Sequence, residues 1–167
     1  MRPSLFPMVL LLAVGCATAP PLRSHFSRPP HLFPADGFIT QRAVLSVHGR
    51  QFPLNGYLSL SAAGGKRLVV TENFGHVVAD VLVKPEGTIF VMKSSPMFPS
   101  KYIRRGLADD LQCLFGDATN QDCPVEMPEA DHFILKRRAY SLDLRILEVK
   151  SGPQPADLFD AAKAEIK

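Results

Sequence analysis

The sequence predicts a mainly β fold (α+β), in which an antiparallel sheet is covered by one helix at about residues 100–115. Two observations predict it. Between residues 38 and 94, short segments with apolar residues at alternate positions are separated by glycine-containing turns, as in an antiparallel meander. Between residues 100 and 116, the apolar spacing changes to that of an amphipathic helix.

The first half of the chain is expected to form strands at residues 38–47, 51–61, 67–71, 76–83 and 88–93. The second of these has the clearest period of two, with four large apolar residues on one face: Phe52, Leu54, Leu58 and Leu60. The fifth is apolar on both faces, which predicts that both faces of the sheet are covered there. After a polar loop at 116–131, strands resume at 133–138 and 140–150.

The predicted helix has Ser100 as its N-cap and Gly116 as its C′ residue. Its apolar stripe has steps of four, four and three residues and consists of Ile103, Leu107, Leu111 and Leu114. Such a stripe must be buried, and the sheet is its partner, with the fifth strand as one contact. The tail at 153–167 forms a short helix from Pro155 or is frayed.

The N-terminus resembles the signal peptide of bacterial lipoproteins. Arg2 precedes an apolar run, Leu5–Val14, whose ten residues are too few to span a hydrocarbon core of about 30 Å. Gly15 then precedes Cys16, as in the lipobox of that family. The resemblance implies that residues 1–15 are removed and that Cys16 is acylated. The alternative is an ordinary secretory peptide that is cleaved near Ala17 or Ala19.

Residues 16–34 contain five prolines and are expected to form a semi-rigid tether, or an arm packed on the domain. The β-rich domain then covers residues 35–152. Since no aspartate follows Cys16, the resemblance favours the outer membrane, with the domain facing the periplasm. Export also favours a disulfide between Cys113 and Cys123, the alternatives being free thiols or a metal pair.

Composition and motifs argue against several classes of function. The formal net charge of +3 is too small to indicate a nucleic-acid partner. Two basic clusters, Arg104-Arg105 and Lys136–Arg138, are expected to be solvated surface or, alternatively, contacts for anionic headgroups. No catalytic, metal or cofactor motif includes any of the five histidines: His25, His31, His48, His76 and His132. Asp109 and Asp110 are expected to make surface or helix–loop hydrogen bonds. We therefore predict no enzyme, no metal and no cofactor.

The order of lipobox, proline-rich tether, meander, leucine-rich helix and further strands resembles a family of outer-membrane lipoproteins related to the lipoprotein receptor LolB. The segment 107–115 and the turn from Val70-Thr71 to Gly75 carry the resemblance. It implies an unclosed antiparallel β-barrel whose apolar concave face holds acyl chains beneath the helix. The residues of such a cavity would be Phe52, Leu54, Leu58, Leu60, Ile89, Val91, Leu107 and Leu111. The alternative is that they are ordinary core.

An apolar residue in a turn is a further candidate site. Phe74 lies in Asn73-Phe74-Gly75, where turns are normally polar, and it either touches membrane or cargo, or folds back onto the sheet. Met97 and Phe98 are the next candidates for such a tip. Three functions remain open: a protein that binds or hands over a lipid or lipoprotein cargo, with a periplasmic carrier as partner; an accessory subunit of an envelope complex with a filled core; and an envelope hydrolase.

Overall fold

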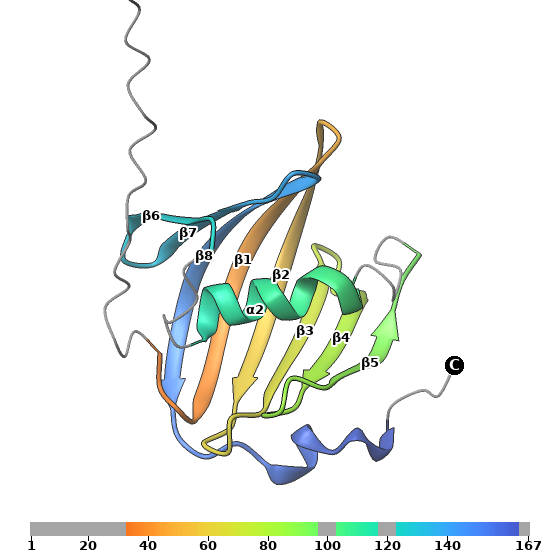
Figure 1. Ribbon diagram of the computed structural model, residues 1–167, viewed down its shortest axis with the longest axis vertical. Helices are drawn as coiled ribbons and strands as arrows, with labels where there is room; N and C mark the ends of the chain where they lie inside the picture. Colours follow the sequence, from red (N-terminus) through yellow and green to blue (C-terminus); the bar gives the residue numbers. More distant parts are fainter. Residues whose placement is uncertain (1–32, 97–102, 117–122, 164–167) are drawn as a thin grey trace, which may run out of the picture.

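A computed structural model describes residues 33–96, 103–116 and 123–163 (Figure 1). The predicted signal peptide, Cys16 and the tether up to residue 32 lie outside the described residues, as do Ser100, Met97 and Phe98. No described helix is long and apolar enough to cross a membrane.

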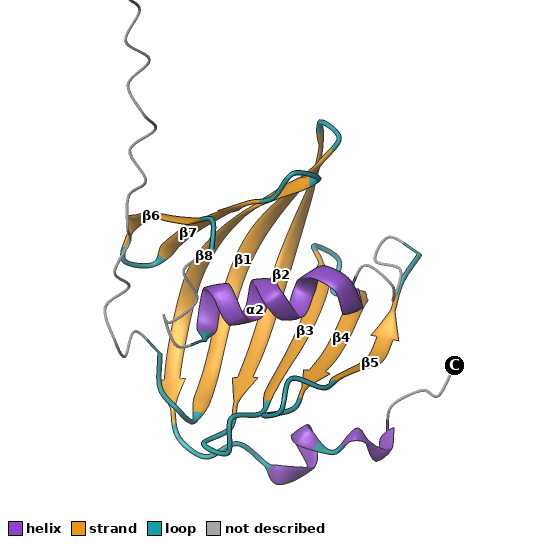
Figure 2. Cartoon of the chain, in the orientation of Figure 1, coloured by secondary structure: helices purple, strands orange, loops and turns teal. Residues whose placement is uncertain are grey.

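The described chain forms a single eight-stranded sheet, in the order β5-β4-β3-β2-β1-β8-β7-β6, and every neighbouring pair is antiparallel. The sheet curves around one helix without closing, so that β5 and β6 are its two edges (Figures 1 and 2). This confirms the mainly β open sheet with one helix. The strands are β1 (Gly37–Val47), β2 (Arg50–Leu60), β3 (Lys66–Glu72), β4 (Val77–Val83), β5 (Ile89–Ser94), β6 (Val125–Glu129), β7 (His132–Lys136) and β8 (Tyr140–Ser151).

The meander was predictable to within one residue at both ends of β1 to β5. The predicted loop at 116–131 is wrong in part, because β6 lies within it and pairs with β7. Because β1, β3 and β7 run in one direction, the β1–β2, β3–β4 and β7–β8 turns share one end of the sheet. We call it the upper end, as in Figure 1.

The helical segment crosses one face of the sheet and has two parts (Figure 2). A π-helical turn, η1 (Ile103–Leu107), leads into the α-helix α2 (Ala108–Phe115). The helix ends at Gly116 as expected, but Gly116 is a C-cap in extended conformation, with φ −91°, and not a left-handed C′ residue. Glycine is needed because a Cβ there would lie 2.5 Å from the main-chain oxygen of Gln112.

The predicted stripe of the helix is buried against the sheet. Leu111 and Leu114 pack on the inner face of β1 and β2, where Ile39 and Leu58 are cross-strand partners with no exposed surface. Ile103 instead packs on β4 and β5. Burying one such aliphatic side chain contributes roughly 1.5–3 kcal/mol, so this face dominates the stability of the domain.

The outer face of β3 to β5 is covered by the end of the described chain. Residues 156–163 form two 3₁₀ turns in place of the expected short helix, η2 (Ala156–Phe159) and η3 (Ala161–Lys163). Arg67 Nη1 donates to Leu158 O at 3.2 Å, and Lys84 Nζ donates to Phe159 O at 2.7 Å. Both η1 and η3 contact β5, where Met92 is buried and Ile89, Phe90 and Val91 are partly buried.

Candidate functional site

The eight predicted cavity residues lie on strands and helix that face one another. Leu54, Leu58, Leu60 and Leu111 are at most 5% exposed, and the last three belong to one packed cluster. The other four, Phe52, Ile89, Val91 and Leu107, are partly buried. Three of these four pack at the margin of a second cluster around Ile103. In the described part of the chain, the concave face is therefore occupied by the side chains of the helix.

Phe74 is a second candidate, and it is 88% exposed at the tip of the β3–β4 turn. The turn is closed by Gly75, whose N–H donates to Glu72 O at 2.9 Å with φ +81°, a conformation that glycine adopts at no steric cost. The alternative that Phe74 packs back onto the sheet is wrong. Its ring projects into solvent at the upper end of the sheet.

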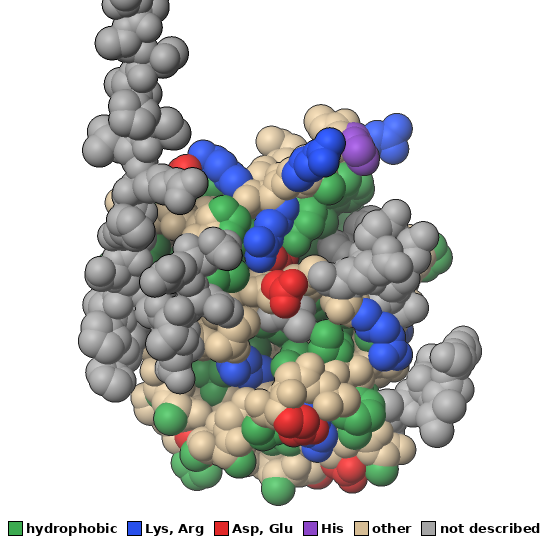
Figure 3. Space-filling view, in the orientation of Figure 1, with side chains coloured by type: hydrophobic (Ala, Val, Ile, Leu, Met, Phe, Trp, Pro, Cys, Tyr) green, Lys and Arg blue, Asp and Glu red, His purple; other side chains and the backbone are tan. Residues whose placement is uncertain are grey.

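A shallow depression of about 480 Å³ lies at the same end, between the β1–β2 and β7–β8 turns. Figure 3 shows Lys and Arg side chains gathered over this end of the molecule. The depression is lined by Ser46, Gly49, Lys136, Arg137, Arg138, Ala139, Tyr140 and Ser141. Its lining includes three basic residues and two serines, in contrast to the apolar core beneath α2.

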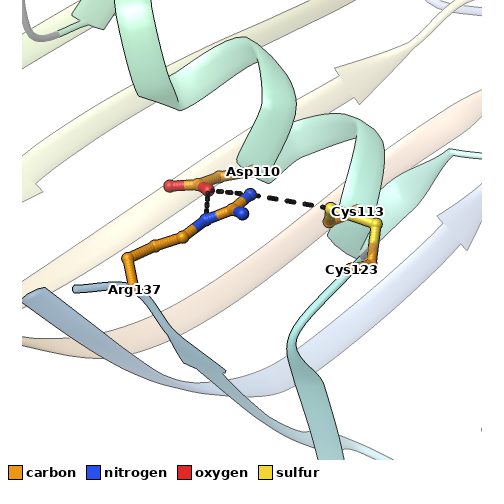
Figure 4. Close-up of a disulfide and its surroundings, with 4 residues drawn as sticks. All are labelled: Asp110, Cys113, Cys123 and Arg137. Atoms are coloured by element: carbon orange, nitrogen blue, oxygen red, sulfur yellow. Dashed lines mark hydrogen bonds and ion pairs between the residues drawn. A yellow bond between two sulfur atoms is a disulfide. The ribbon is translucent and has the colours of Figure 1, made fainter. Parts of the chain in front are cut away.

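The depression is held to the helix by a buried polar cluster, which Figure 4 shows in part. Asp110 of α2 is 4% exposed and accepts two hydrogen bonds, from Arg137 Nε at 3.0 Å and from the hydroxyl of Tyr140. Burial raises the pKa of Asp110, against the opposing effect of those two donors. Burial, reinforced by the hydrogen bond to Asp110, raises the pKa of Tyr140 well above its ordinary value.

The predicted disulfide lies beside this cluster. Cys113 at the end of α2 and Cys123 before β6 are bonded, with their Cα atoms 5.4 Å apart. Arg137 Nη2 lies 3.7 Å from Cys113 Sγ, so that one guanidinium touches both the carboxylate and the disulfide (Figure 4). The disulfide therefore links the helix covalently to the segment just before β6, and the ion pair with Arg137 links it to the β7–β8 turn.

The described histidines are dispersed. His132 Nε2 lies 2.9 Å from Asp143 Oδ1, and His76 pairs with Glu72, while His48 is in the β1–β2 turn. His25 and His31 lie outside the described residues. Among the residues that the structure places, no group of three or more His, Cys, Asp or Glu side chains could hold a metal ion.

Asp110 was expected to make surface or helix–loop hydrogen bonds; it does bond from the helix to Arg137 in the β7–β8 turn, but it is buried and not at the surface. The signal was present, because Asp110 is three residues after Leu107 and four before Leu114, at the margin of the apolar stripe. Its partners could not be named from sequence, since they come from another part of the sheet. No family model and no curated protein matches this sequence.

Proposed function

We propose that this chain is a non-catalytic lipoprotein of the bacterial cell envelope, anchored in the outer membrane through acylated Cys16, that binds or hands over an acylated, lipid-like molecule. The observation that carries the proposal is the 88% exposure of Phe74 at the tip of a tight turn. Leaving a phenylalanine side chain in water forgoes about 1.5–3 kcal/mol of burial, which a membrane or an acyl chain would supply.

Acyl cargo would lie on the concave face, on the residues of β5 that pack with Ile103 of η1, Ile89 and Val91. The helix that would have to yield is short, since α2 has 8 residues and begins with a π turn. Its disulfide lies at the far end from η1, so η1 can move while the Cys113 end stays fixed. A periplasmic carrier that delivers the cargo would be the natural partner. The chemistry requires no bond to be made or broken.

A second function is favoured by a different observation. The packing of Leu58, Leu60 and Leu111 into one cluster, each at most 5% exposed, suits an accessory subunit of an envelope complex with a filled core and no ligand. The two functions differ in whether lipid co-purifies with the exported chain. Native mass spectrometry of that chain is expected to show a bound acylated species. Its absence from the spectra would favour the accessory subunit.

The tip is tested separately, by flotation of the full-length Cys16→Ser chain with phosphatidylcholine vesicles, because this variant cannot be acylated. Adding Phe74→Glu should abolish flotation without changing stability by more than about 0.5 kcal/mol, as expected of a surface position. The matched control is Leu147→Glu on β8, where the side chain is also apolar and 55% exposed. Equal losses in the two variants would refute a specific tip.

A further inference from the structure

We infer that the depression at the upper end of the sheet is a binding site for the phosphate group of an anionic lipid headgroup. This inference rests on the proposed function, which brings that end of the sheet to a membrane. It concerns different residues from the Phe74 tip, so the two can fail separately.

The site is built on a row of hydrogen-bond donors that crosses four strands. Ser46 of β1 is the cross-strand partner of Gln51 on β2 and of Ser141 on β8, and Ser141 is the partner of Lys136 on β7. Directly opposed side chains on one face lie about 4.5–5.5 Å apart. Two hydroxyls, an amide and an ammonium group thus form a continuous line of donors, of which three members line the depression.

The row is on the outer face of the sheet, away from α2. Its neighbours in β1 and β8, Leu45 and Leu142, are partners on the opposite face, and Leu142 packs on the core cluster. The row therefore lies on the face that the helix leaves uncovered. The adjacent hydroxyls of Ser46 and Ser141 are close enough to donate to one tetrahedral oxyanion, which accepts several hydrogen bonds at once.

One arginine of the adjoining β7–β8 turn supplies charge. Arg138 lines the depression, is exposed, and has no ion-pair partner among the residues that the structure describes. Arg50, the first residue of β2, does not line the depression, and its pairing with Val47 places it on the inner face of the sheet. Arg137, by contrast, is committed to Asp110, and its role is to hold the turn in place. Of the three basic residues that line the depression, Arg138 therefore keeps a charge that no described carboxylate neutralises.

Nearby carboxylates do not cancel this charge. Glu126 lies 2.8 Å from Lys136 Nζ, but both side chains are more than half exposed, and such a pair exchanges partners at little cost. Asp143, one step further along β8 on the outer face, is bonded to His132. Because the depression is open and cationic at the Phe74 end of the molecule, an anionic headgroup in a membrane surface can enter it directly.

The test measures vesicle binding of the full-length Cys16→Ser chain, with and without phosphatidylglycerol in phosphatidylcholine vesicles. Binding should be stronger with phosphatidylglycerol, and Arg138→Gln should weaken it about fivefold, since each basic residue near an anionic surface contributes about 1 kcal/mol. The control, Arg50→Gln, removes the same charge from an exposed position at the same end of the sheet but outside the depression. Equal losses in the two variants would overturn the inference.

Two further measurements separate a site from diffuse attraction. Ser46→Ala with Ser141→Ala changes no charge, and it should still lower the preference for phosphatidylglycerol several-fold. Inorganic phosphate should compete with these vesicles better than chloride at equal ionic strength. An unchanged preference, or equal competition by the two anions, contradicts the site. If Phe74→Glu abolishes flotation while the Arg138→Gln variant binds normally, this inference fails and the proposed function stands.

Discussion

Tyr140, the first residue of β8, donates its hydroxyl to the buried carboxylate of Asp110 on α2, and Arg137 donates to the same carboxylate from the other side of the turn. These two bonds join the helix to the β7–β8 turn. Between Asp110 and Tyr140 the chain runs through the disulfide and two strands, so the contact closes a long segment on itself.

We expect Asp110→Ala to lower the free energy of unfolding by about 3 kcal/mol, the low end for breaking a buried ion pair, because Arg137 keeps some access to water. Urea denaturation measures the change. Asp109→Ala is the matched control, since Asp109 is next to Asp110 but its carboxylate is exposed. This variant should change the stability by no more than about 0.5 kcal/mol. A similar effect of both variants would mean that the buried cluster contributes nothing of its own.

Tyr140 should make the fold sensitive to alkali. The pKa of Tyr140 is raised in the folded protein above its value of about 10 in the unfolded chain. The stability that Tyr140 contributes is therefore complete below about pH 10 and is lost as the pH rises above it. Tyr140→Phe should therefore destabilise the protein at pH 8, and the difference from wild type should shrink above pH 10. Urea denaturation at several pH values measures this. Tyr57→Phe, at an exposed tyrosine, should give a curve parallel to that of wild type.

Removing the disulfide with Cys113→Ser and Cys123→Ser should destabilise the domain by roughly 3 kcal/mol or slightly less, the value expected for a loop closed over 10 residues. Thermal unfolding with and without reductant measures the same quantity in the unmodified chain. The two approaches should agree. A melting temperature that reductant leaves unchanged would show that the bond carries no stability.

Replacing Gly56 is expected to destabilise the protein because of one neighbour. A Cβ at this position would lie 2.5 Å from Nε2 of Gln41, which is 4% exposed beneath the helix. Gly56→Ala should cost about 1–3 kcal/mol through overpacking, and most of that loss should disappear when Gln41→Ala is combined with it. A double-mutant cycle from urea denaturation measures the coupling. Additive effects would contradict the contact.

Cys16→Ser should release the protein from the membrane fraction into the soluble periplasmic fraction. Cell fractionation measures the distribution, and labelling with an alkyne fatty acid should mark the wild type and not the variant. Cys113→Ser is the control, since it removes a cysteine from the folded domain and should leave the labelling intact. Membrane association of Cys16→Ser equal to that of the wild type, together with an unlabelled wild type, would exclude a lipid anchor.

The meander was predictable because its signals are local. In β2, alternating apolar residues and flanking glycines mark both the strand and its ends, and Leu58 lies on the inner face as expected. β6 was not predictable, since Pro128 and the two glutamates of Val125–Glu129 are atypical of a strand. It forms at an edge, beside β7 and next to the disulfide, where tertiary contacts override a weak local preference.

The depression was predictable only in part. Lys136–Arg138 was recognisable as a basic cluster, but the sequence does not say that Arg137 turns inward to Asp110 while Arg138 stays exposed. The row of donors depends on cross-strand register, which joins Ser46 to Ser141 across almost a hundred residues of sequence. Turn geometry and pairing set that register, and neither is readable from one segment alone.

The C-terminal turns are held by bonds from Arg67 and Lys84 to the main-chain carbonyls of Leu158 and Phe159. Every amino acid has a main-chain carbonyl, so these bonds do not depend on which side chains are present at positions 158 and 159. They depend on spacing instead, because a deletion or an insertion of one residue after Gly152 would carry both carbonyls out of reach. This segment should therefore tolerate substitution at Leu158 far better than a change in length.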